Sequence, residues 1–570
     1  MIIPSRRRAL CAALGLASAA AGALVAIHYA RLGLTLSHYD ARGHLVVARR
    51  IADSITPGWQ QVGAVWLPLP HLLNFLPAQI DWLYRTGASA VAMSIVSFAV
   101  ATGAVAWIVF ALTGSVAAAL LGSAVFAVNP NVLYLQATPM TELLLLALTL
   151  TAIALLTDGV SRSAGLPPSR ASAFASASAD RRSLVRLRAK RYGETSTKLE
   201  ERSRGGGGQA CLADAADLKV RTTTAADVTT RGLKPPRDGS PATTGWAFAL
   251  ACMTRYEAWP VTICALVAAV WAWWRRGVDI VAALRRAGEV ARYPAIAIAA
   301  FALYSRVVIG EWFIAGGFFV PENKALCRPL VAAAEIWWGA HALSGSLTMA
   351  LAAVGLCALL VAALVDRNRA AWLIPLSLLA AAVLPWAAFL KGHPFRIRYM
   401  VPLIAAEAIG VGVAVGLVRR AAPVAALLAA ALLAFDFGPL DPSAPMVLEA
   451  QWDVPNVRAR EAVTDCLRSK YDGDTIMASM GSLGHYMQEA SRRGFVLRNF
   501  LHEGNGDIWL AALDGPRPYA GWLLIEEKAE GGDMLAAIAR ERPAFLDGYE
   551  RVCSGAGLAL YRRTAAAQRP

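Results

Sequence analysis

A succession of long apolar segments constrains the fold of this chain more than any other feature. The first covers residues 9–36, directly after the basic residues Arg6, Arg7 and Arg8. It exceeds the roughly 20 residues that a helix needs to cross a bilayer. It is also longer than the apolar core of a cleavable signal peptide, so we expect it to be retained. With 56% of 570 residues hydrophobic, the chain is predicted to be a polytopic α-helical membrane protein.

Further apolar runs follow at residues 88–112, 116–128, 143–156, 246–274, 293–309, 346–365, 371–390, 400–418 and 423–437. The run 246–274 is interrupted by charged residues and a proline at 254–260, which indicates two helices meeting at a turn, or a broken helix that lines a cavity. Arginine pairs at alternate ends of the runs predict which ends are cytoplasmic. Counting 246–274 as a hairpin gives about eleven crossings, with the N-terminus in the cytoplasm and the C-terminus outside.

Composition divides the chain into four predicted parts. Residues 1–157 form an N-terminal membrane part whose first outer loop is 37–87. Residues 158–243 hold 16 basic and 9 acidic residues with serine, alanine and glycine repeats, a composition that predicts a disordered cytoplasmic insertion. Residues 244–437 form a second membrane part. Residues 438–570, with 15 basic and 18 acidic residues, alternate strand-like and helix-like stretches and predict an extracytoplasmic α/β domain.

The net charge of +15 does not indicate a nucleic-acid partner, because the positive excess lies in the membrane part and the predicted cytoplasmic insertion. The cysteines show no spacing typical of a metal site. Cys466 and Cys553 both fall in the C-terminal region. An oxidising compartment would permit them to pair, and two separate thiols fit the sequence equally well.

The most prominent candidate for chemistry is Asp40, just past the outer end of the first apolar segment. A lipid-linked substrate and an acceptor from the water side can meet at this position. His44 follows at i+4 and shares a helical face with Asp40, and Arg42 adds a cation nearby. Aspartate is also a favoured helix N-cap, so capping is the alternative to catalysis.

Two later outer loops carry basic side chains close together. Loop 310–330 contains Lys324, and residues 391–399 contain Lys391, His393, Arg396, Arg398 and Tyr399. Because basic residues are depleted on outer faces, this density indicates an anion site, and arginine suits bidentate phosphate binding. The alternative is a collar that binds lipid headgroups.

Arg255 and Glu257 stand within the apolar run 246–274. Ionisable groups in membrane segments are candidates for function by default. A buried structural ion pair, with each other or with Glu142, is an equally good interpretation.

Taken in their order along the chain, these motifs resemble the membrane glycosyltransferases of the GT-C class, in particular the protein O-mannosyltransferase and aminoarabinose-transferase type. Asp40 with His44 resembles the first-loop motif of that class. Residues 129–142 resemble the turn after its third span, and 250–259, with Thr254 and Arg255, resemble its Leu-Thr-Lys/Arg hairpin. The resemblance covers about residues 9–437 and excludes the insertion. Ala41 stands where mannosyltransferases usually carry a second acid, which leaves the acceptor class and any use of a divalent cation open.

The resemblance implies an enzyme that transfers a sugar, with inversion, from a polyprenyl-phosphate-linked donor to an acceptor hydroxyl at the outer face. From the predicted topology we expect this membrane to be a bacterial inner membrane. The acceptor is a lipid, a glycan or a protein. Asp40 would be the general base, and cations would stabilise the lipid phosphate that leaves. No cofactor is required with certainty. The predicted substrate-binding residues are Arg42, His44, Glu142, Arg255, Glu257, Lys324, Lys391, His393, Arg396, Arg398 and Tyr399.

A transporter or flippase of lipid-linked sugars is the alternative function. Such proteins carry internal repeats with breaks at matching positions of the two halves. The sequence shows a break at 254–260 and no matching second one, and its charged motifs lie on one predicted face. Both observations favour the glycosyltransferase.

Overall fold

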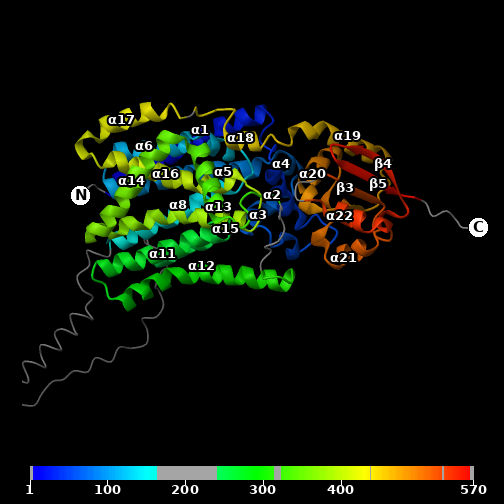
Figure 1. Cartoon of the computed structure of the whole chain (residues 1–570), viewed down its shortest axis with the longest axis horizontal. Coiled ribbons are helices and arrows are strands. Elements are labelled where there is room, and N and C mark those ends of the chain that lie inside the picture. Colours follow the sequence, from blue (N-terminus) through cyan, green and yellow to red (C-terminus); the bar gives the residue numbers. More distant parts are fainter. Residues whose placement is uncertain (1–3, 163–239, 313–321, 437, 529–531, 565–570) are drawn as a thin grey trace, which may run out of the picture. The chain divides into compact units, whose positions relative to one another are not determined.

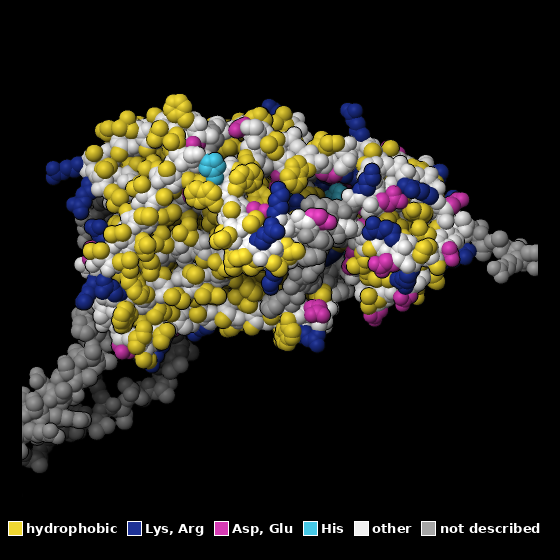
Figure 2. Space-filling model, viewed as in Figure 1, with side chains coloured by type: hydrophobic (Ala, Val, Ile, Leu, Met, Phe, Trp, Pro, Cys, Tyr) yellow, Lys and Arg dark blue, Asp and Glu magenta, His cyan; other side chains and the backbone are white. Residues whose placement is uncertain are grey.

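The apolar segments form long helices that pack side by side, and a smaller α/β region follows them (Figure 1). The computed structural model describes residues 4–162, 240–312, 322–436, 438–528 and 532–564. Most of the predicted insertion 158–243 therefore lies outside the described residues. Apolar side chains cover the helices, whereas charged side chains are dense over the α/β region (Figure 2). This distribution fits helices that face lipid and a domain that faces water.

Within the described residues, seven segments are long and apolar enough to cross a membrane. They are α1 (Pro4–Arg31), α5 (Ala88–Thr113), α8 (Glu142–Arg162), α11 (Ala258–Arg275), α14 (Ser346–Val365), Arg367–Leu390, which comprises η3 (Arg367–Ala382) and α15 (Val383–Leu390), and Ile397–Gly416, which comprises η4 (Ile397–Met400) and α16 (Val401–Gly416). The predicted polytopic helical membrane protein is thereby confirmed, whereas the number of about eleven crossings stays a prediction.

The remaining helices of the membrane part are either short or charged. They are α6 (Val116–Val128), α7 (Pro130–Leu135), α10 (Pro241–Cys252), α12 (Ile280–Val308), α13 (Pro329–Ser344) and α17 (Ala422–Leu433), with the one-turn η5 (Arg419–Ala421) before α17. Helix α10 ends at Cys252 and α11 begins at Ala258, so the helix is broken close to the charged residues that interrupt the apolar run.

Helix α16 is the centre of the bundle, because every residue from Val401 to Gly416 is buried. It packs closely against α14 through small residues. A Cβ atom at Gly355 of α14 would overlap the carbonyl group of Gly410, and one at Gly410 would press on Ala352. Small residues at such contacts let helix backbones approach, which is the usual basis of helix association in membranes.

Loop 37–87, the predicted first outer loop, contains the buried helix α2 (Tyr39–Arg50), η1 (Trp59–Val62), α3 (Leu69–Ala78) and α4 (Asp81–Thr86). Helix α2 begins where His38 adopts an extended backbone and its side chain accepts a hydrogen bond from the Asp40 backbone amide. Histidine thus takes the capping position that the sequence alternative had given to aspartate. Ten of the twelve residues of α2 are buried, including Asp40, Arg42 and His44.

The C-terminal region begins with α18 (Pro445–Glu449) and α19 (Val454–Lys470) and then forms a five-stranded sheet of order β2-β1-β3-β5-β4. Strands β1 (Ile476–Ala478), β2 (Phe500–Leu501) and β3 (Trp522–Glu526) are parallel, and β5 (Leu558–Arg563) runs antiparallel to β3 and to β4 (Tyr549–Gly555). Helices α20 (Met480–Ala490), α21 (Asp507–Asp514) and α22 (Met534–Glu541) connect the strands, with short 3₁₀ turns η6 (Ser491–Arg493), η7 (Leu497–Asn499), η8 (Glu503–Asn505) and η9 (Pro543–Leu546). The predicted α/β domain is confirmed.

A disulfide joins Cys466 of α19 to Cys553 of β4. The structure thus selects pairing, one of the two interpretations that the sequence left open.

The α/β region shares a hydrophobic core with the first outer loop. Leu36, Leu45 and Val46 from the membrane side pack in one cluster with Tyr486 and Phe500. By contrast, Ala444, Met446, Val447 and Ala450 pack with the membrane helices. The first residues after the predicted domain boundary at 438 therefore belong, by packing, to the membrane part.

Candidate active site

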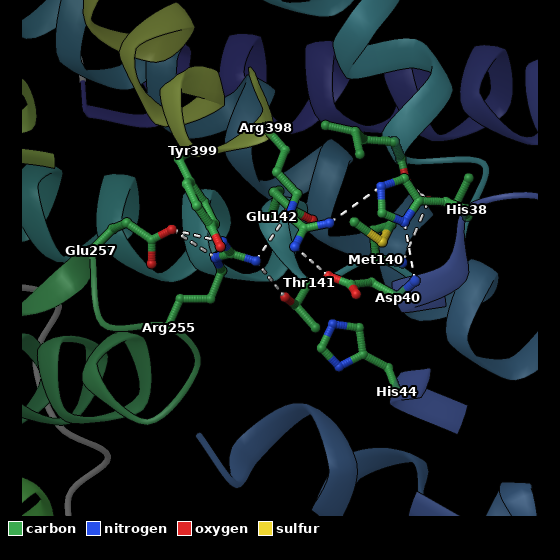
Figure 3. Close-up of polar contacts among 12 residues, drawn as sticks. His38, Asp40, His44, Met140, Thr141, Glu142, Arg255, Glu257, Arg398 and Tyr399 are labelled. Carbon is green, nitrogen blue, oxygen red and sulfur yellow. Dashed lines mark hydrogen bonds and ion pairs between the residues drawn. The ribbon is translucent and has the colours of Figure 1, made fainter. Parts of the chain in front are cut away.

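Four side chains from three distant segments meet at the start of α2. The Arg398 guanidinium contacts the Asp40 carboxylate, with 2.6 Å between Nη2 and Oδ2. Arg398 Nη1 lies 3.2 Å from His38 Nε2 and 3.9 Å from Glu449 Oε1. His38 Nε2 is itself 3.2 Å from Glu449 Oε1. All four residues are buried, so this is a desolvated cluster of two carboxylates, a guanidinium and an imidazole and not a surface ion pair. Figure 3 shows Asp40, Arg398 and His38 of this cluster.

A second cluster surrounds the half-buried Arg255, between α10 and α11, and its polar partners are buried. Arg255 Nη1 donates to Glu142 Oε1 at 2.9 Å and to Thr141 Oγ1 at 3.3 Å. Arg255 Nη2 donates to Glu257 Oε1 at 2.7 Å. Burial alone would lower the pKa of Arg255, but the charges of Glu257 and Glu142 outweigh it and raise the pKa. The ion pairs that the sequence suggested as structural are therefore present, and they lie next to the Asp40 cluster (Figure 3).

Tyr399 connects the two clusters. Its ring centroid is 5.4 Å from the Cζ atom of Arg398 and 5.9 Å from that of Arg255. The ring of Tyr39 also faces Arg398, at 5.6 Å. Aromatic faces attract guanidinium groups at these distances. Burial is the main cause that raises the pKa of Tyr39 to about 12, so its hydroxyl stays protonated and remains a hydrogen-bond donor.

His44 shares the Asp40 side of the cluster, as the i+4 spacing predicted (Figure 3). Its Nδ1 atom is 3.0 Å from His71 Nε2, and its ring lies 4.3 Å from the Trp66 ring. Burial is the largest cause that lowers the pKa of His44 well below its ordinary value, and it lowers the pKa of His71 to about 3. The site therefore contains a pair of neutral imidazoles beside its charged groups.

The other predicted residues lie at the edge of the site or away from it. His393 Nε2 is 3.4 Å from the Tyr399 hydroxyl, and burial lowers the pKa of His393. The guanidinium of Arg396 lies 6.0 Å from the Tyr39 ring. Lys324 is exposed and lines a cavity of about 290 Å³ with Glu322, Asn323, Glu335, Pro394 and Phe395.

Two predicted residues point elsewhere. Lys391 is exposed at the end of α15. Arg42 forms an ion pair with Glu489 of α20 and donates to the Leu36 carbonyl. The substrate-binding roles predicted for these two residues stay predictions.

His38 and Glu449 are the functional candidates that the sequence analysis did not select. His38 stands two residues before Asp40, so its proximity was readable from the sequence. Glu449 is 411 residues away from His38 along the chain. No local pattern indicates a contact of that separation.

In the two ionic clusters, two buried polar atoms have no hydrogen-bond partner in the described part of the chain. They are Nε of Arg398, a donor, and Oε2 of Glu142, an acceptor. A buried unsatisfied group costs about 1–3 kcal/mol, so both atoms would gain from a substrate group. Among the described residues, no group of three or more His, Cys, Asp or Glu side chains has an arrangement that could hold a metal ion.

The chain is similar to known proteins in its three-dimensional structure and not in its sequence. No family model matches the chain, and a search of the curated proteins gives no match. The chain is similar to the crystal structure of ArnT from Cupriavidus metallidurans bound to undecaprenyl phosphate, at 12% identity and a TM-score of 0.52, over 97% of this chain and 99% of ArnT. It is also similar to the apo oligosaccharyltransferase from Archaeoglobus fulgidus, at 12% identity and a TM-score of 0.48, over 97% of this chain and 75% of that one.

Proposed function

Because the chain has the fold of the GT-C class of membrane glycosyltransferases, we propose that it transfers a glycosyl group from a polyprenyl-phosphate-linked donor to an acceptor hydroxyl. The observation that carries the proposal is the buried pair of Asp40 and Arg398. It places a carboxylate and a cation together just beyond the first membrane helix. The structurally similar ArnT was crystallised with a polyprenyl phosphate, which supports the same class of lipid carrier here.

In this mechanism Asp40 is the general base. Arg398 holds its Oδ2 atom, whereas no described residue forms a hydrogen bond with Oδ1. Oδ1 is therefore the oxygen that accepts the proton of the acceptor hydroxyl. As the proton leaves, the acceptor oxygen attacks the anomeric carbon from the face opposite the phosphate. The bond between the anomeric carbon and the phosphate oxygen breaks, and the polyprenyl phosphate leaves with the electron pair. The anomeric configuration is inverted.

The leaving phosphate gains negative charge, and we assign the buried guanidinium of Arg398 and the half-buried guanidinium of Arg255 to its stabilisation. Such charges act strongly because they are preorganised in a site that excludes water. Glu142 and Glu257 hold Arg255 in place. We assign His44, His393, Arg396 and Tyr399 to the wall that faces the substrate, and Lys324 and Lys391 to its outer edge.

We further propose that this site faces the outside of a bacterial inner membrane, with the N-terminus in the cytoplasm and the α/β domain outside. The positive-inside distribution of arginines supports this orientation. The acceptor is a lipid, a glycan or a protein, and the sugar is a hexose or a pentose.

The test uses purified protein in lipid, a panel of polyprenyl-phosphate sugars and a membrane extract as the source of acceptors. Release of free polyprenyl phosphate is followed by mass spectrometry. We expect wild-type protein to release it from one donor or more, and Asp40→Asn to be slower by about 10²- to 10⁴-fold, the usual contribution of a general base. Glu407→Gln is the matched control, because it also converts a buried carboxyl group to an amide, on α16. Equal release from wild type and Asp40→Asn would remove Asp40 from the mechanism, and no release from any donor would contradict the proposed function.

A further inference from the structure

Arg398 has two carboxylates within reach, and only one of them is the proposed base. Asp40 is in contact at 2.6 Å, whereas Glu449 Oε1 lies 3.9 Å from Nη1. The Glu449 side chain is 2% exposed, so water does not solvate it. Burial alone would raise the pKa of Glu449, but the hydrogen bond with His38 and the charge of Arg398 lower it below its ordinary value. An ionised Glu449 therefore competes with Asp40 for the same guanidinium.

His38 lies between the competitors, and its hydrogen bonds fix the position of its ring proton. The backbone amide of Asp40 donates to Nδ1 at 3.1 Å. A nitrogen that accepts a hydrogen bond carries no proton, so in this geometry the ring is neutral and its proton is on Nε2. The Nε2–H group can then donate only to Glu449 Oε1, at 3.2 Å. Arg398 Nη1, although equally close to Nε2, is itself a donor and gains no hydrogen bond there.

We propose that His38 is a positioning residue that occupies Glu449 and so reserves Arg398 for Asp40. This inference rests on the proposed function, in which Arg398 holds the base and faces the leaving phosphate. If the hydrogen bond from His38 to Glu449 is lost, the Glu449 carboxylate has no donor to its Oε1 atom from His38, and the Arg398 guanidinium is the cation beside it, at 3.9 Å. Arg398 then moves toward Glu449, and Asp40 loses the contact that orients it.

The arrangement also makes the segment after the last membrane helix part of the active site. Glu449 ends α18, and the Met446 amide at the start of this helix donates to Asn131 Oδ1 at 3.0 Å. Asn131 in turn donates to the Leu343 carbonyl at 3.0 Å. Glu449 is thus held in position by the membrane bundle. Its contact with His38 is not needed for capping α2, because His38 caps the helix through Nδ1 and contacts Glu449 through Nε2.

Two substitutions of His38 separate positioning from helix capping. His38→Asn keeps an oxygen at the position of Nδ1 and caps α2 well, but it is too short to donate to Glu449. His38→Gln places an amide N–H near the position of Nε2 and loses the cap acceptor. We expect kcat for polyprenyl phosphate release to fall about 10- to 100-fold in His38→Asn, in line with the cost of misplacing a catalytic group, with KM for the donor little changed. We expect His38→Gln to stay within about threefold of wild type.

A third variant allows a double-mutant cycle, which tests whether the effects of the two substitutions are additive. Glu449→Gln keeps an acceptor for His38 and removes the competing charge, and its own rate is the reference for the double variant. The double variant His38→Asn with Glu449→Gln should recover most of the activity that His38→Asn loses, because no carboxylate then draws Arg398 away. A purely structural role of His38 predicts no recovery. The inference is overturned if His38→Asn is as active as wild type, if His38→Gln is the slower of the two, or if the double variant is as slow as His38→Asn.

A separate measurement distinguishes failure of this inference from failure of the proposed function. If wild-type protein releases no lipid phosphate from any donor, the proposed function fails. An experimental structure of His38→Asn then decides the positioning without any substrate. Arg398 in contact with Glu449 and parted from Asp40 would support it, and Arg398 still in contact with Asp40 would overturn it. If His38→Asn does not fold, His38→Gln decides, because activity below about one tenth of wild type contradicts the inference.

Discussion

The contact between α2 and α20 gives a prediction that can be worked out from the structure. Glu489 of α20 receives Arg42 of α2 and also Arg460 of α19, and the side chains are 14%, 9% and 2% exposed. Glu489→Gln removes the negative charge and leaves two buried cations. Arg460 keeps Asp453, at 2.5 Å, but among the described residues Arg42 keeps only the Leu36 carbonyl. Removing one partner of a buried ion pair typically costs about 3–5 kcal/mol.

The assay is hydrogen exchange by mass spectrometry on peptides of α20, with the protein in nanodiscs. Because 1.4 kcal/mol corresponds to a tenfold change, exchange through local opening should accelerate by about a hundredfold to a few thousandfold. Adding Arg42→Met to Glu489→Gln removes the stranded cation as well, so the double variant should recover to within about 1–2 kcal/mol of wild type. Acceleration below about tenfold in the single variant, or no recovery in the double variant, would refute the reasoning.

The same pair predicts how this contact depends on pH. Burial would raise the pKa of Glu489, but Arg42 and Arg460 outweigh it and lower the pKa below its ordinary value. A carboxylate whose pKa is lowered on folding stabilises the folded state at pH values above its unfolded pKa of about 4.3. This stabilisation is lost as the pH falls through the lower, folded value. Protection of α20 should therefore decrease below about pH 4 in wild type and much less in Glu489→Gln.

Three further predictions concern other parts of the chain. Gly355→Ala should lower the thermal midpoint in detergent, because its Cβ atom would overlap the Gly410 carbonyl; Gly288→Ala, whose Cβ meets nothing within 4 Å, is the control and should be neutral or slightly stabilising. Reducing the Cys466–Cys553 disulfide, which links residues 87 apart, should destabilise the α/β domain by about 2–4 kcal/mol, measured by denaturant unfolding with and without reductant; an unchanged transition would contradict the pairing. Arg255→Gln leaves Glu142 and Glu257 without their cation, so it should lower the free energy of unfolding by about 3–5 kcal/mol and abolish lipid phosphate release. Arg255→Lys keeps the charge and should keep most of the stability. Equal thermal midpoints for the two variants would argue against the ion pairs.

Local features of the sequence predicted much of the fold. Apolar length identified the membrane helices, and the charged interruption after Cys252 marked the break between α10 and α11. In the C-terminal region, short apolar runs bounded by polar residues marked strands such as Trp522–Glu526. These features are predictive because burial in lipid or in a sheet constrains consecutive residues, so it produces an apolar pattern within a short stretch of sequence.

The site was predicted only where its members are near one another in the sequence or carry unusual charge. Helical geometry explains one outcome: Asp40 and His44 are four residues apart and share a face, whereas Arg42 is two residues from each and lies on another face of α2, toward Glu489. The spacing alone would have separated Arg42 from the other two. Glu449 is different, because a single acid between apolar neighbours carries no signal of a partner 411 residues away.

A buried helix with ionic groups on two faces couples whatever packs on those faces. Toward the membrane part, α2 presents Asp40 to Arg398, and toward the α/β region it presents Arg42 to Glu489. Helix α2 is only twelve residues long, too short to be stable without tertiary packing. Its position is therefore set by both contacts together, and loosening the contact with α20 must also displace Asp40. The α/β domain thus stabilises the geometry of the site without contributing a residue to the Asp40 and Arg398 pair.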